Sequence, residues 1–379
     1  MKTVEILKDL VSFETVSKQN NLSMIGYIDN YLKKFSSQSE LIMGNKNQAN
    51  YYARIGPKTN DGIMFSGHTD VVPIDGQNWK TKPFQAKLIK NKVYGRGTCD
   101  MKGFIAVVLS ILPRININNL RKPIHLMFSY DEEIGCVGIQ KAVPFIKKMS
   151  HKPKFCVVGE PTEMKLISQH KGKKNFLVSF HGIASHSSLK EEGVNAIDFA
   201  AEFVVYLSKV QDELKLKKFT DECFNPPYTT VNVGQINGGI ALNIVPSECT
   251  VEFELRDLPT INIDLFVKKI ESFLTTIELR MKKLNKGAYL KFEKNNSFLG
   301  LNTDDNCEII EKSLNALGSN KLGTVSFGTE AGIFDKLGIQ TIVCGPGSIK
   351  QAHKPDEFVT IQQLKKCEKF LTKMIKNLY

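Results

Sequence analysis

Apolar residues recur at two different spacings along the chain, and each spacing predicts one kind of element. Helical spacing begins near the N-terminus with Ile6, Leu7 and Leu10, and it returns from Ile25 to Phe35. Short, largely apolar runs, which are typical of strands buried on both faces, occupy 63–65, 124–129, 155–158 and 340–344. Helical patterns lie between and after them at 104–109, 138–149, 305–316 and 361–377. This alternation predicts an α/β domain with a mixed, partly parallel sheet and helices on both faces.

The pattern changes near residue 174. From there the sequence predicts, in order, a strand, a helix, two strands and a helix, at 176–182, 195–216, 229–237, 247–255 and 263–281. A lysine-rich stretch followed by Gly287 then ends the segment. We therefore expect an inserted α+β domain of β-α-β-β-α order over 174–286, while 1–173 and 287–379 together form one larger domain.

Histidine and acidic side chains follow the predicted buried strands. His68 ends the first strand, Glu132 and Glu133 follow the second, and Glu160 follows the third. Ligands of α/β sheets bind beyond the carboxyl ends of the strands. Residues two apart on a strand share a face, so Asp70 lies beside His68. A carboxylate in that position fixes the tautomer that a metal-ligating histidine needs.

Two further candidates, Asp100 and His353, lie in polar turns. Taken singly, these residues and the acids above have simpler explanations, as helix caps, solvated helix starts or a loop histidine. Taken together, buried acids without a compensating charge would cost several kcal/mol. A pair of divalent ions is the simplest compensation, and mixed imidazole and carboxylate donors suit zinc, with cobalt or manganese as alternatives.

Length and composition restrict the class of protein. A chain of 379 residues exceeds the usual size of one hydrophobic core, so two domains are expected. No apolar run has the length of a membrane span, and the first residues lack the apolar core of a signal peptide. The eight cysteines are scattered without a Cys-x-x-Cys pair, which disfavours a thiolate zinc site or a disulfide framework. We expect a cytoplasmic protein with no membrane partner.

The net charge of +12 requires nucleic-acid binding to be considered. However, the lysines are spread along the chain, and the single tryptophan leaves no interleaving of aromatic and basic residues for base stacking. We expect no nucleic-acid partner. The basic surface is interpreted as solvated, with a mild attraction for a small acidic substrate.

Five segments together resemble one enzyme family. They are the polar motifs at 66–73, 95–103, 131–133, 159–162 and 352–357. In this order and at this spacing they resemble the M20 family of di-zinc amidohydrolases and peptidases. The resemblance covers the whole chain. It implies that the larger domain is a catalytic metal-binding domain and that the insert is a dimerisation and lid domain.

The resemblance also implies how the metal ligands are shared. Asp100 would bridge two zinc ions, His68 and Glu160 would complete one of them, and Glu133 and His353 would complete the other. The peptide bond that follows the bridging aspartate would be cis.

Three further residues receive catalytic roles from the resemblance. Asp70 would be the partner of His68. Glu132 would be the general base for a water activated by the two metals, and would later return the proton to the departing amine. His186 resembles the family's oxyanion histidine, which a second copy of the chain supplies, so a homodimer is expected.

Four residues bear on the substrate. Asn243 lies in a loop that resembles the family's substrate loop, and Arg256 resembles the arginine that binds the α-carboxylate of the substrate. Thr329 and Glu330 lie in a stretch, 326–334, that differs from the pattern of the succinyl-diaminopimelate desuccinylases and resembles that of the acetylornithine deacetylases. A carboxylate at Glu330 would also suit a cationic substrate side chain.

The resemblance therefore implies a hydrolase that converts N2-acetyl-L-ornithine to L-ornithine and acetate, a reaction of arginine biosynthesis. The alternatives are a succinyl-diaminopimelate desuccinylase, another N-acyl-amino-acid amidohydrolase or a dipeptidase of the same family. A binding protein that kept the fold and lost turnover is less consistent with the residues, because a pure binder needs no free Glu132 beside a metal ligand.

Overall fold

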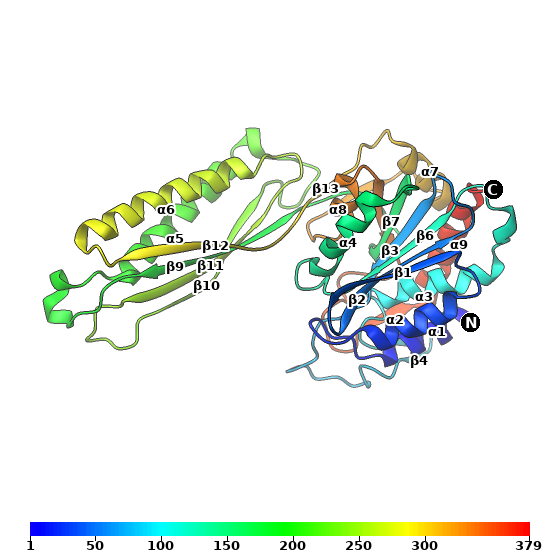
Figure 1. The fold of residues 1–379 in the computed structure, drawn as a ribbon, viewed down its shortest axis with the longest axis horizontal. Coiled ribbons are helices and arrows are strands. Elements are labelled where there is room, and N and C mark those ends of the chain that lie inside the picture. The colour runs from blue at the N-terminus through cyan, green and yellow to red at the C-terminus, as the bar shows by residue number, and fades with distance from the viewer. The chain divides into compact units, whose positions relative to one another are not determined.

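The predicted buried strands form the centre of one mixed sheet in the computed structural model, which describes all 379 residues (Figure 1). Its four central strands are β6 (Ile124–Ser129), β3 (Ile63–His68), β7 (Phe155–Pro161) and β15 (Gln340–Gly345). Each of these is parallel to its neighbour in the order β6-β3-β7-β15. Their carboxyl ends therefore lie along one edge of the sheet.

Antiparallel strands extend the sheet on both sides. The full order is β1-β2-β6-β3-β7-β15-β8-β13, and β14 also pairs with β8. The added strands are β1 (Gln38–Asn45), β2 (Gln48–Ile55), β8 (Leu166–His170), β13 (Leu301–Asn302) and β14 (Leu322–Val325). The sheet is therefore mixed and only partly parallel.

Helices cover both faces of this sheet. Two consecutive tyrosines of β2 contact helices on opposite faces. Adjacent strand residues point to opposite faces. The Tyr51 hydroxyl donates to Asp29 in α2 (Leu22–Leu32), whereas the Tyr52 ring packs edge-on against Phe145 in α4 (Val137–Lys148). The remaining helices are α1 (Lys2–Ser12), α3 (Lys102–Ile111), α7 (Glu308–Leu317), α8 (Ala331–Lys336) and α9 (Ile361–Lys376). The fold class predicted from the sequence is confirmed.

Helix α3 is the most deeply buried helix of this unit, and it begins two residues after Asp100. All of its residues are buried, as expected for a helix that is apolar on every side. It shares one hydrophobic core with α1 and α9, and it packs against β3 and β7. The turn that carries Asp100 is therefore attached to one of the most rigid parts of the chain.

A separate three-stranded sheet connects two distant turns. It contains β4 (Lys87–Ile89), β5 (Lys92–Tyr94) and β16 (Phe358–Thr360), in the order β16-β5-β4. Tyr94 and Phe358 are directly paired in the antiparallel register. Strand β5 leads into the Asp100 turn and β16 follows the loop that carries His353, so this small sheet holds the two segments side by side.

The second unit has its own sheet and core. Its strands are antiparallel in the order β10-β11-β9-β12, and their bounds are β9 (Lys173–His181), β10 (Thr230–Gly238), β11 (Glu248–Arg256) and β12 (Tyr289–Phe298). Alternate residues of β9, namely Phe176, Val178 and Phe180, are buried in a core shared with α5 (Ala196–Leu214) and α6 (Asp264–Leu284).

The second unit is longer than the predicted insert. It comprises His170–Gly300 and Val325–Gly328, and the first unit comprises the remaining three segments. The difference is β12, which pairs with β9 along most of its length but has few apolar residues. An edge strand with one exposed face has little hydrophobic pattern in its sequence. The predicted insert therefore ends at the lysine-rich stretch before β12.

None of the helices combines the length and apolar character needed to cross a membrane. All eight cysteines are free.

Candidate metal centre

The candidate ligands lie at the carboxyl edge of the four parallel strands. His68 is the last residue of β3, Glu133 lies in the turn after β6, and Glu160 is the penultimate residue of β7. His353 lies in the loop after β15, and Asp100 lies in the turn before α3. The parallel arrangement therefore brings together five residues that are spread over most of the sequence, as expected for a sheet of this type.

Asp100 lies between the two histidines, with one oxygen facing each of them. Its Oδ1 is 3.1 Å from His68 Nε2, and its Oδ2 is 3.4 Å from His353 Nε2. Glu160 Oε1 lies 3.7 Å from His68 Nε2, and Glu133 Oε2 lies 2.9 Å from His353 Nε2. The site thus has two halves, each with one imidazole and one further carboxylate, and Asp100 is common to both. The peptide between Asp100 and Met101 is cis, as predicted.

The donor set fits a pair of divalent ions of the zinc type. Donor atoms of His68, Asp100 and Glu133 lie within 4.8 Å of one another, and so do those of His68, Glu132 and Glu160. Imidazole nitrogens and carboxylate oxygens are common zinc ligands. No lysine or arginine forms an ion pair with Glu132, Glu133 or Glu160, so bound cations would supply the missing positive charge.

Three glutamates of the site have raised pKa values because they are buried close to other carboxylates. Burial, together with the neighbouring Asp100 carboxylate, raises the pKa of Glu133 to about 7. Burial also raises the pKa of Glu160 and of Glu132 well above the ordinary value. Hydrogen bonds to Asp100 and Glu133 raise the pKa of His353 to about 10. Metal ligands must be deprotonated, so binding of cations here would release protons.

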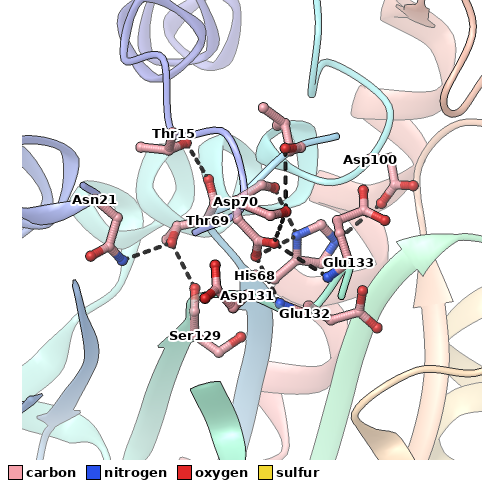
Figure 2. Close-up of polar contacts among 12 residues, drawn as sticks. Thr15, Asn21, His68, Thr69, Asp70, Asp100, Ser129, Asp131, Glu132 and Glu133 are labelled. Carbon is pink, nitrogen blue, oxygen red and sulfur yellow. Dashed lines mark hydrogen bonds and ion pairs between the residues drawn. The ribbon is translucent and has the colours of Figure 1, made fainter. Parts of the chain in front are cut away.

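Asp70 connects His68 to the turn after β6 (Figure 2). His68 Nδ1 is 2.9 Å from the backbone carbonyl of Asp70 and 3.5 Å from its Oδ1. The carbonyl is the closer acceptor, so an Nδ1–H donated to it leaves Nε2 free to face Asp100 and Glu160. The sequence suggested the carboxylate of Asp70 for this task, and the backbone of the same residue is better placed to perform it.

The Asp70 carboxylate also holds the backbone of Glu132 and Glu133. Its Oδ1 accepts the Glu132 N–H at 3.0 Å, and its Oδ2 accepts the Glu133 N–H at 3.2 Å and the Ser17 hydroxyl at 2.8 Å. Burial alone would raise the pKa of Asp70, but its hydrogen bonds with His68, Ser17 and the Glu132 N–H outweigh burial and hold that pKa below the ordinary value. Asp70 is therefore charged and fully engaged.

The turn after β6 has a second anchor in Asp131, which the sequence analysis did not single out. Asp131 adopts a positive φ of 51°, and its Oδ1 accepts hydrogen bonds from the Lys18 N–H and the Gln48 side chain. Just before it, the Ser129 carbonyl accepts the Thr69 hydroxyl at 2.6 Å (Figure 2). Residues from three separate segments thus fix this turn, and no local pattern in the sequence predicts that convergence.

Glu132 lies beside the candidate ligands with one local partner. The Cys136 thiol donates to its Oε1 at 3.4 Å, which is a weak contact that leaves the carboxyl able to accept a proton. The raised pKa noted above favours a proton-carrying role over permanent ionisation.

Thr329 and Glu330 are in the interior of the first unit. They are 0% and 1% exposed, and the Thr329 hydroxyl accepts the Ala331 N–H at the start of α8. Neither carboxyl oxygen of Glu330 has a partner at ordinary hydrogen-bond geometry, and burial raises the pKa of this group to about 7. A substrate contact for either residue stays a prediction.

His186, Asn243 and Arg256 belong to the second unit. His186 forms an antiparallel bridge with Ile244, and the Ser187 N–H donates to the Asn243 carbonyl, so the first two are neighbours. Both are exposed. Arg256 is at the opposite end of β11 from the Asn243 loop, and its Nε donates to Glu254 at 3.1 Å. The structure thus brings together two of these three residues.

Comparison with known proteins identifies the class to which this fold and site belong. The family described as "Peptidase family M20/M25/M40" matches residues 64–377. The chain therefore belongs to the M20 family of metallopeptidases and amidohydrolases, as the sequence motifs indicated.

The relatives and structural neighbours are consistent with this assignment. Proteins named acetylornithine deacetylase from Buchnera aphidicola and Pasteurella multocida are 34% and 32% identical, over 99% and 94% of this chain and 97% and 91% of their own lengths. An M20 family metallo-carboxypeptidase from Sulfolobus solfataricus has the same fold, with a TM-score of 0.80 at 17% identity and 99% coverage of both chains.

Proposed function

We propose that this chain hydrolyses the amide bond of N2-acetyl-L-ornithine to give L-ornithine and acetate, in arginine biosynthesis. The support is the whole-length similarity to relatives that carry the name acetylornithine deacetylase. The observation that carries the chemistry is Asp100, whose two oxygens face two different histidines. We propose two Zn²⁺ ions as the cofactor, with Co²⁺ or Mn²⁺ as alternatives.

The proposed ligands are His68 and Glu160 on one side, Glu133 and His353 on the other, and Asp100 between them. Bound there, the two ions would activate a water molecule and polarise the scissile carbonyl. His68 and Glu160 lie within buried parallel strands, and such rigid elements keep catalytic geometry better than loops do. Asp100, Glu133 and His353 lie in turns and a loop, which need hydrogen bonds to hold them.

Glu132 is the proposed general base. Its carboxyl takes a proton from the attacking water and later gives that proton to the departing amine nitrogen, so it ends the cycle unprotonated. The backbone N–H groups of Glu132 and Glu133 both donate to Asp70, so the same carboxylate holds the base and its neighbouring ligand. The base therefore keeps a fixed position relative to the metal ligands.

The substrate contacts are proposed for the second unit and for the stretch before α8. Arg256 would bind the α-carboxylate, and Asn243 would lie near the substrate. His186 would donate a hydrogen bond to the developing oxyanion in the site of a second copy, which makes a homodimer through the inserted domain part of the proposal. Glu330 would meet the cationic end of the substrate, with Thr329 beside it.

The substitution Glu132→Gln tests the mechanism. The amide has nearly the same shape but cannot accept the proton, so turnover should fall by about 10²- to 10⁴-fold. Zinc content, measured by elemental analysis on the same sample, should stay at the wild-type level. Turnover within about tenfold of wild type would contradict the assignment of Glu132 as base.

A substrate panel tests the specificity. Amine release should be measured from N-acetyl-ornithine, N-succinyl-diaminopimelate, other N-acyl amino acids and dipeptides, with zinc and after chelation. Chelator-sensitive turnover that is fastest with N-acetyl-ornithine supports the proposal. A preference for the succinyl substrate or for dipeptides would assign the chain to another branch of the family.

A further inference from the structure

The carboxylate of Glu357 accepts four hydrogen bonds in the interior of the first unit. The residue is 1% exposed. Its Oε1 accepts the backbone N–H groups of Cys99 and Asp100 at 2.8 and 3.1 Å. Its Oε2 accepts the Gly97 N–H at 3.0 Å and Arg96 Nη1 at 2.8 Å. Both oxygens are fully used, so Glu357 is not available as a further ligand, although it follows His353 by only four residues.

These contacts fix the turn that carries Asp100. Three backbone donors of that turn, from Gly97, Cys99 and Asp100, point at one carboxylate, and Arg96 compensates its charge. A buried carboxylate is costly unless it is both paired and hydrogen-bonded, and here it is both. Removing it would leave the N–H groups of Gly97, Cys99 and Asp100 without acceptors, so the turn would have to rearrange.

The same group of residues holds the loop that carries His353. The Gly95 N–H donates to the Glu357 carbonyl at 2.9 Å, and Arg96 Nη1 also reaches the Lys354 carbonyl at 3.3 Å. Arg96 Nη2 donates to Gln77 Oε1 at 2.6 Å, and Gln77 Nε2 in turn donates to the His353 carbonyl at 3.0 Å. The His353 side chain is about half exposed, at 52%, and its contacts with Glu133 and Asp100 reach only the ring nitrogen Nε2. Its backbone is held by this network.

We propose that Glu357, with Arg96, is a positioning pair that sets Asp100 and His353 at the correct separation for a shared metal ion. This inference rests on the proposed metal function. The pair touches neither the substrate nor the ions. It acts through the backbone on Asp100, which is common to both halves of the centre, and on the loop of His353, which belongs to one half only.

The other half is supported by different contacts. His68 is held by the Asp70 carbonyl, and Glu160 lies within strand β7. Neither residue has a hydrogen bond to Glu357 or Arg96. Because Asp100 is shared, loss of Glu357 should weaken both metal sites, but it should weaken the site that also depends on His353 more strongly. A general loss of stability would not produce such a difference. Substitution of residues that support metal ligands typically lowers metal affinity by about 10- to 100-fold.

The experiment measures Zn²⁺ binding to the metal-free full-length protein by competition with a chromophoric chelator, which resolves two successive dissociation constants. Glu357→Ala should weaken one constant by at least about tenfold, and the loss in the other constant should be smaller by at least about threefold. Glu357→Gln keeps one oxygen for the Cys99 and Asp100 N–H groups, so it should restore part of the loss. Glu368→Gln is the matched control. It removes a largely buried carboxylate in α9 that bonds to Thr3 and Arg114 and to neither ligand loop.

The possible results separate the two proposals. Equal weakening of both constants, or no change in either, would overturn the positioning role while two ions still bind to the wild type. A wild-type protein that binds fewer than two ions would overturn the proposed metal function, and this inference with it. If Glu357→Ala fails to fold, the two Zn²⁺ dissociation constants of Glu357→Gln are compared in the same way. The unfolding temperatures of Glu357→Gln and Glu368→Gln are measured alongside, to separate a loss of metal affinity from a loss of stability.

Discussion

Asp70→Asn offers the sharpest test of how the chain positions its general base. Asp70 uses both carboxylate oxygens on the backbone of the turn after β6, one for Glu132 and one for Glu133. Asparagine has nearly the same shape but only one acceptor oxygen. One of the two N–H groups would therefore face an amide group that cannot accept its hydrogen, and the turn would shift to avoid this contact.

The structure gives an approximate magnitude for the loss. A hydrogen bond to a charged group contributes about 1.5–3 kcal/mol, and Asp70→Asn removes one such bond and the charge from the other. If about 2–3 kcal/mol of transition-state stabilisation is lost, kcat should fall by about 30- to 150-fold. KM should change by less than about threefold, because Asp70 lies behind His68 and the turn and has no route to the substrate.

The assay is initial-rate kinetics with parallel elemental analysis of bound zinc. Ser17→Ala is the matched control, because it removes the Ser17 hydroxyl from the same carboxylate and leaves both backbone bonds in place. It should lower kcat by less than about fivefold. Full zinc content together with a kcat within about threefold of wild type in Asp70→Asn would refute the reasoning. A rise in KM with unchanged kcat would do so as well.

Three further predictions follow from other parts of the chain. His186→Ala and Glu132→Ala, each inactive alone, should regain activity when mixed and allowed to exchange subunits; no recovery after demonstrated exchange would contradict a shared site. Removal of metal from the wild type by a chelator should abolish turnover, and added Zn²⁺ should restore it; turnover that survives verified metal removal would exclude the di-metal mechanism. Burial lowers the pKa of His125 from 6.5 to about 3, so between these pH values the unfolded chain binds one more proton, and stability should fall as the pH drops below 6.5 by about 1.4 kcal/mol per unit. Urea unfolding at pH 7 and pH 5 should therefore show a smaller loss in His125→Gln than in wild type, and equal losses would contradict this account.

The arrangement of the first unit could be predicted because its strands are buried on both faces. Runs such as 124–129 and 155–158 stand out as short, largely apolar segments. The rule that ligands gather at the carboxyl ends of parallel strands then placed His68, Glu133 and Glu160 close together before any contact was known. Strand β12 lacks that signal because many of its residues are polar and exposed, so the sequence predicts no strand there.

The supporting contacts of the centre could not be predicted, because they join residues with no local relation in the sequence. The spacing of two identified Asp70 as the partner of His68. It gave no sign that the Asp70 carboxylate also accepts the N–H groups of Glu132 and Glu133, more than sixty positions later. Glu357 was visible only as the last residue of a motif. A backbone N–H has no signature in the amino-acid sequence, so carboxylates that bind backbone are indistinguishable there from solvated acids. In this protein two of them, Asp70 and Glu357, hold the turns on either side of the proposed metals, and the precision of the centre depends on acids that are not ligands themselves.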